Sequence, residues 1–114
     1  MTAPQRPSQT TVAEWVARFV ATGVPALGDP LVLPQDDEEN ADAFIVLVHL
    51  RHAPAAVYLQ LDESMRWAAT LTERPNDLTG TSLDLIALGA EVGAAGQLCA
   101  YLQQRTDAQL VPSP

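Results

Sequence analysis

Apolar residues recur at two different spacings along this chain, and the change of spacing predicts where helices and strands lie. Between residues 12 and 20 they recur every three or four positions, which is typical of a helix with one apolar face. Thr10 or Thr11 can cap this helix, and Gly23 followed by Pro25 ends it. The apolar positions of this helix are Val12, Trp15, Val16, Phe19 and Val20.

From residue 43 to residue 71 the pattern changes to that of strands. The run from 43 to 51 is apolar on both sides and rich in strand formers; a buried helix would also fit, but Pro54 favours a central strand. The runs from 57 to 61 and from 65 to 71 alternate apolar and polar residues, and the Asp-Glu-Ser turn between them is short. Residues 31 to 33 can add an edge strand. We therefore expect an antiparallel meander of three or four strands.

The last predicted element is a long helix from residue 82 to residue 105, which Thr81 or Ser82 can cap. Its only charged residues are Asp84, Glu91 and Arg105, so more than half of its circumference is apolar or small. Such a helix is normally buried on two sides. We expect one sheet face to cover part of it, and either the first helix or another subunit to cover the rest.

Together these elements predict a single α+β domain over residues 10–110, with both helices on one face of the sheet. The ends of the chain, residues 1–9 and 111–114, contain prolines, and we expect a flexible leader and a flexible tail there.

The chain has 114 residues, with 14 acidic and six basic side chains, and a formal net charge of −8. A charge of this sign repels nucleic-acid and anionic lipid phosphates, so direct binding to either is disfavoured. The single cysteine and the absence of a long uninterrupted apolar run favour a cytoplasmic protein.

No motif for catalysis, phosphate binding or a cofactor occurs, and we expect neither an enzyme nor a bound cofactor. His49 and His52 have the three-residue spacing of helical metal ligands, but on a strand they point to opposite faces, so a structural role is favoured over a metal site. Cys99 lies on the apolar stripe of the last helix, where core packing is favoured over nucleophilic chemistry.

Two further groups of residues have competing interpretations. The first group is the acidic cluster, which consists of Asp36, Asp37, Glu38, Glu39 and Asp42. Its default interpretation is a solvated loop. Alternatively, it imitates nucleic-acid phosphates and binds the basic surface of a partner protein. Three helical glycines, each unfavourable in a helix, indicate close approach of another backbone. That backbone belongs either to the chain's own sheet, which is slightly favoured, or to a helix of a second subunit. The three glycines are Gly89, Gly93 and Gly96.

The second half of the chain has the order strand, turn, strand, connector and long apolar helix, which is carried by YLQLDES, MRWAATLTERP, Leu78 and LDLIALGAEVGAAGQLCAYL. This order is similar to the second half of class I type III secretion chaperones of the CesT-like kind. The first helix, TVAEWVARFVATGVP, resembles their opening helix. The chain lacks room for the helix that follows the third strand in that family. The resemblance implies a homodimer that keeps a segment of a secreted effector extended, without ATP.

The sequence thus predicts a small acidic protein-binding module, most concretely a secretion-type chaperone. The alternatives are an acidic inhibitor or immunity-type protein that uses the acidic cluster, and a small enzyme with a pocket around His49 or His52. Aromatic residues dominate protein interfaces, so we predict partner contacts at aromatic positions. For Trp15, Phe19 and Trp67, packing in the core explains the residue type equally well. The predicted partner contacts are Trp15, Phe19, Trp67 and Tyr58.

Overall fold

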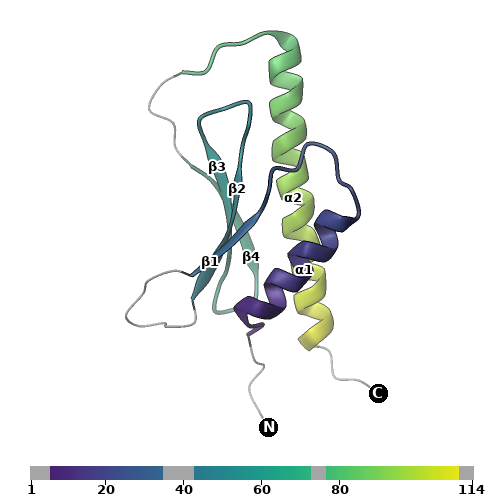
Figure 1. Ribbon diagram of the computed structural model, residues 1–114. Helices are drawn as coiled ribbons and strands as arrows, with labels where there is room; N and C mark the ends of the chain where they lie inside the picture. Colours follow the sequence, from purple (N-terminus) through teal and green to yellow (C-terminus); the bar gives the residue numbers. More distant parts are fainter. Residues whose placement is uncertain (1–5, 35–42, 73–76, 111–114) are drawn as a thin grey trace.

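The computed structural model describes residues 6–34, 43–72 and 77–110, and it contains two helices and four strands within these ranges. The acidic cluster, Asp36 to Asp42, lies outside the described residues. The elements follow the chain as α1 (Gln9–Ala21), β1 (Leu31–Pro34), β2 (Phe44–His49), β3 (Ala56–Leu61), β4 (Trp67–Leu71) and α2 (Ser82–Leu110). Both helices lie on one face of the sheet, which confirms the predicted α+β architecture (Figure 1).

Helix α1 begins two or three residues earlier than predicted. Ser8, rather than Thr10 or Thr11, is the N-cap, because its hydroxyl accepts a hydrogen bond from the Thr11 amide at 3.1 Å. The guanidinium of Arg6 donates to the carbonyl oxygens of Leu61 and Asp62. Arg6 is therefore held against the β3–β4 turn, and Ser8 and Gln9, at the end of the predicted leader, form the cap and the first residue of α1. At the other end Gly23 adopts a positive φ of 77°, which glycine permits at a helix end.

The four strands form one antiparallel sheet in the order β1-β2-β3-β4, so every connection is a hairpin. Val46 pairs with Val32 on β1 and with Leu59 on β3, which fixes the register of the two central strands. Strand β4 begins at Trp67 and not at residue 65, because Met65 has a φ of 62° and belongs to the turn. Of the predicted core face of this strand only Trp67 is buried; Ala69 and Leu71 are exposed.

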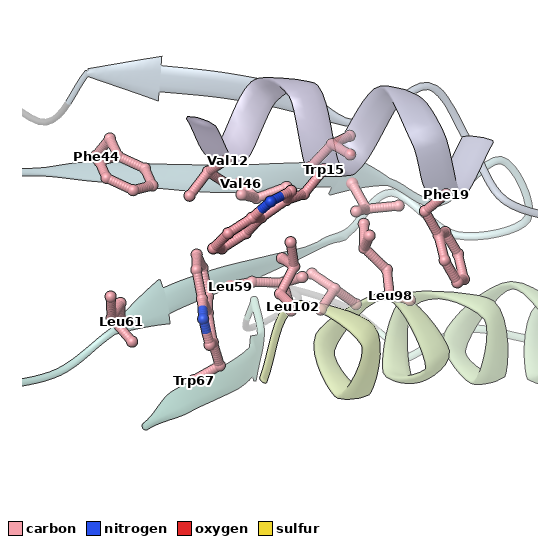
Figure 2. Close-up of a cluster of buried hydrophobic side chains, with 14 of the residues drawn as sticks. Val12, Trp15, Phe19, Phe44, Val46, Leu59, Leu61, Trp67, Leu98 and Leu102 are labelled. Atoms are coloured by element: carbon pink, nitrogen blue, oxygen red, sulfur yellow. The ribbon is translucent and has the colours of Figure 1, made fainter. Parts of the chain in front are cut away.

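The core lies between the helices and the inner face of the sheet (Figure 2). Helix α1 contributes Val12, Trp15, Val16 and Phe19, and the C-terminal half of α2 contributes Leu98 and Leu102, both fully buried. The rings of Phe19 and Tyr101 lie 5.2 Å apart, and Arg105 lies over the Trp15 ring at 5.7 Å. Helix α1 therefore covers α2 only along its C-terminal half.

Polar contacts fasten the same half of α2 to β4. The Trp67 indole Nε1 donates to the Thr106 hydroxyl at 2.9 Å, and the Trp67 amide donates to the Gln103 side chain at 2.7 Å. Thr106 is completely buried. Within the core, these bonds determine which stretch of α2 lies against the start of β4.

We expect Thr106→Val to lower the free energy of unfolding by about 1–3 kcal/mol, because the shape is kept but the buried indole N–H loses its acceptor. Urea unfolding monitored by tryptophan fluorescence measures this change. Thr106→Ser, which retains the hydroxyl and removes one methyl group, is the control and should cost less. Equal losses in the two variants would show that the bond contributes little.

Candidate functional site

The N-terminal half of α2, from Ser82 to Gly93, is the part of the described chain whose large apolar side chains are most exposed. It extends beyond the region that α1 covers (Figure 1). Leu83, Leu85 and Ile86 are 75%, 69% and 67% exposed. Neither α1 nor the sheet covers the outward side of this half, so of the two covers expected for the helix, α1 supplies one only along the C-terminal half, and cover by another subunit stays a prediction.

We call this outward side the outer face of α2; it consists of Leu83, Ile86, Gly89, Ala90, Gly93, Gly96 and Ala100, all of them exposed. A Cβ atom added at Gly89, Gly93 or Gly96 would meet no atom within 4 Å. The reading in which these glycines admit the chain's own sheet is therefore wrong. The small side chains leave a shallow strip along the helix, with Leu83 and Ile86 at its N-terminal end.

A second feature, which we call the hairpin pocket, opens on the other side of the same helix segment. Its volume is about 730 Å³. The β2–β3 turn, residues 51–54, forms one wall, and residues 78–88 form the other. Apolar side chains from both walls line it, together with Arg51, His52, Asp84 and three hydroxyl side chains; the apolar residues are Ala53, Pro54, Leu78, Leu85 and Leu88.

Glu91 holds the two walls of this pocket together. Its side chain is only 2% exposed, and its carboxylate accepts hydrogen bonds from the backbone amides of Arg51 and His52. The His52 Nδ1 atom lies against the same carboxylate. Burial by itself raises the pKa of Glu91, but the hydrogen bonds from Arg51 and His52 outweigh it, and the net pKa is lowered. Glu91 is thus an ionised buried group whose hydrogen-bond partners come from the β2–β3 turn.

The N-terminus of α2, at the rim of the pocket, is capped reciprocally. The Asp84 amide donates to the Thr81 hydroxyl at 3.2 Å, and the Thr81 amide donates to the Asp84 carboxylate at 2.9 Å. Thr81 is therefore the cap, one of the two predicted candidates. The bond from the Thr81 amide is the main cause of the lowered pKa of Asp84. Both polar groups are engaged with each other at the helix end.

The histidines and the cysteine lie apart from one another. His49 is exposed at the end of β2, whereas His52 lies in the turn against Glu91. Within the described ranges no three His, Cys, Asp or Glu side chains are grouped so that they could hold a metal ion. Cys99 is half-buried against the core, its Sγ 3.9 Å from the Trp67 carbonyl oxygen, and burial raises the pKa of its thiol. This agrees with the packing role.

The predicted aromatic contacts divide between the core and one sheet face. Trp15, Phe19 and Trp67 are each at least 91% buried, so the competing core reading holds for these three and they are not free for a partner. Tyr58 is half-buried on the sheet face opposite the helices, where it pairs with Leu47. The sequence did not single out Glu91, although it is the only Asp, Glu, Lys or Arg between Leu85 and Gln104, which was the available signal. Of the outer face of α2 it singled out the three glycines.

Helix α2 is also long and apolar enough to span a membrane, with a mean hydropathy of 1.4 over its best 18-residue window, of which 28% is buried. Length and composition do not distinguish a membrane span from the long core helix of a soluble protein. No protein-family model matches the chain, and comparison with curated proteins and with solved structures also gives no match.

Proposed function

We propose that this chain is a small, acidic, non-enzymatic protein-binding module of the secretion-chaperone type, which holds an extended apolar segment of another protein in the hairpin pocket. The observation that carries the proposal is the lining of that pocket: five apolar side chains from two walls, with Leu78 and Leu85 41% and 69% exposed. Exposed apolar surface that is contiguous and concave is the usual mark of a binding site.

The chemistry of the pocket favours a peptide segment over a reacting substrate. Asp84 is engaged by the helix cap and Glu91 by the β2–β3 turn. These two carboxylates are therefore engaged in holding the walls, and His52, which also lines the pocket, lies with its Nδ1 atom against Glu91. Apolar side chains supply the affinity for such a segment, and the hydroxyl groups of Thr79, Thr81 and Ser82 at the rim can bond to its backbone.

The proposal is tested by capture from the native host with tagged wild-type protein, followed by titration of the captured partner's segment as a synthetic peptide. Binding through apolar contacts should survive a wash at about 1 M salt, where the Debye length falls to about 3 Å. Leu78→Ser should weaken peptide binding by about tenfold or more, and Leu78→Met should retain it. Leu33→Ser is the matched control, because Leu33 is similarly exposed, at 36%, but lies on β1.

Two results would contradict the proposal. Release of the partner at high salt would indicate an electrostatic contact, as expected for an acidic inhibitor. Equal weakening by Leu33→Ser and Leu78→Ser would place the contact outside the pocket.

A further inference from the structure

His52 lines the hairpin pocket with a ring that is held along one edge. Its Nδ1 atom lies against the buried carboxylate of Glu91. The side chain is 42% exposed, and within the described residues its Nε2 atom has no hydrogen-bond partner. Building on the binding function proposed above, we propose that Nε2 accepts a hydrogen bond from the bound segment, so that the pocket selects an aromatic ring with an N–H or O–H donor, the indole of a tryptophan or the phenol of a tyrosine.

Glu91 determines which nitrogen of the His52 ring carries a proton. An ionised carboxylate can only accept hydrogen bonds, so Nδ1 is the nitrogen that donates to it. In the neutral ring Nε2 is then bare and is an acceptor. The two nitrogens flank one carbon atom of the ring, so Nε2 points away from the carboxylate that Nδ1 faces. Glu91 is thus a positioning residue, which orients the ring and makes Nε2 a stronger acceptor.

The rest of the lining favours an aromatic ring as the carrier of the donor. Tryptophan and tyrosine combine a large apolar ring with one donor, and that donor usually finds a partner when the ring is buried. A phenylalanine ring in the same place would displace water from Nε2 and offer no hydrogen bond in return, which lowers affinity. The apolar side chains that would contact the ring come from both walls of the pocket: Ala53, Pro54, Leu78, Leu85 and Leu88.

A cationic donor and a metal ion fit the pocket less well. The carboxylate of Asp84 already accepts a hydrogen bond from the Thr81 amide, and Arg51 places a positive charge in the same lining. Within the ranges that the structure describes, His52 does not belong to any group of three His, Cys, Asp or Glu side chains that could hold a metal ion. A neutral donor on an apolar ring is therefore the best match to the acceptor.

The test uses two probes that differ in the donor. Indole has an N–H group, whereas 1-methylindole presents a similar apolar surface without a donor. Both are titrated into the ¹⁵N-labelled full chain and followed by NMR, at a pH where the ¹⁵N shifts of the His52 ring show that it is neutral. Indole should shift the amide signals of residues 51–54 and 78–88, and it should bind about fivefold more tightly than 1-methylindole.

Two substitutions separate the roles of the two ring nitrogens. His52→Asn keeps an amide nitrogen near the position of Nδ1, so it can still donate to Glu91, but it has no atom at the position of Nε2. In this variant the two probes should bind equally, and hydrogen exchange of residues 50 to 55 should be unchanged. His52→Gln, whose amide oxygen reaches the region of Nε2, should recover part of the preference for indole. His49→Asn is the matched control, because His49 is exposed at the end of β2, and it should keep the full preference.

Three results would overturn the proposal: equal binding of the two probes to the wild type, a preference for indole that persists in His52→Asn, or the absence of binding at the pocket. Loss of the preference together with faster exchange of residues 50 to 55, without recovery in His52→Gln, would also overturn it, because His52 would then only support the wall. Equal binding of both probes at the pocket leaves the proposed apolar binding intact. That function is judged separately, by the captured peptide and Leu78→Ser.

Discussion

Leu98→Ala should lower the free energy of unfolding by about 2–5 kcal/mol, the loss expected when a fully buried leucine is truncated. Leu98 is fully buried between the sheet and α1, so its truncation removes apolar contacts and leaves a cavity. Leu83→Ala, in the same helix, should change the free energy by no more than about 0.5 kcal/mol, because Leu83 is 75% exposed. Urea unfolding of the two variants, monitored by tryptophan fluorescence, measures the contrast.

The comparison tests how α2 is anchored. If the N-terminal half of the helix were packed within the monomer, Leu83→Ala would cost about as much as Leu98→Ala.

Glu91→Ala is the second change with a large expected effect. It leaves the amides of Arg51 and His52 without their acceptor and should lower the free energy of unfolding at neutral pH by about 2–3 kcal/mol. Glu91→Gln should not restore it, because the carboxylate accepts bonds through both oxygens and a glutamine amide has only one acceptor. Hydrogen exchange of residues 50 to 55 should show faster opening of the β2–β3 turn in both variants.

The pH dependence of this contribution has a definite sign. The pKa of Glu91 is lower in the folded state than its ordinary value of 4.5. A carboxyl group with a lowered pKa binds protons more weakly in the folded state, so its contribution is complete above pH 4.5 and is lost as the pH falls through the lower, folded pKa. The stability difference between wild type and Glu91→Ala should therefore be constant near neutral pH and shrink under acid conditions. A difference that grows as the pH falls would show that the carboxyl is bound in its protonated form.

The strands and helices could be predicted because their signals are local. Alternation marked β3, the apolar run bounded by Pro54 marked β2, and both helices followed from apolar spacing and nearby caps. The errors fall at the ends of elements, where a single side-chain contact or a single backbone dihedral angle decides the boundary. Ser8 extended α1 because its hydroxyl reaches the Thr11 amide, and Met65 left β4 because its backbone turns with positive φ.

The site depended on contacts between distant parts of the chain. Glu91 accepts hydrogen bonds from Arg51 and His52, which lie about 40 positions away in the sequence. The spacing of apolar residues in α2 does not predict such a contact. Composition alone showed that α2 has more apolar surface than one sheet face can bury. Where that surplus is exposed depends on how far α1 and the sheet extend along the helix.

The sequence by itself thus determined the elements of this protein, their antiparallel order and the excess of uncharged apolar surface on α2, because hydrophobic periodicity and turn residues act over a few positions. Only the tertiary structure decided which part of α2 is covered. Docking of α1 and Trp67 against the C-terminal half buries Leu98 and Leu102, while Glu91 ties the other half to the β2–β3 turn and leaves Leu83, Ile86 and Gly93 facing outward.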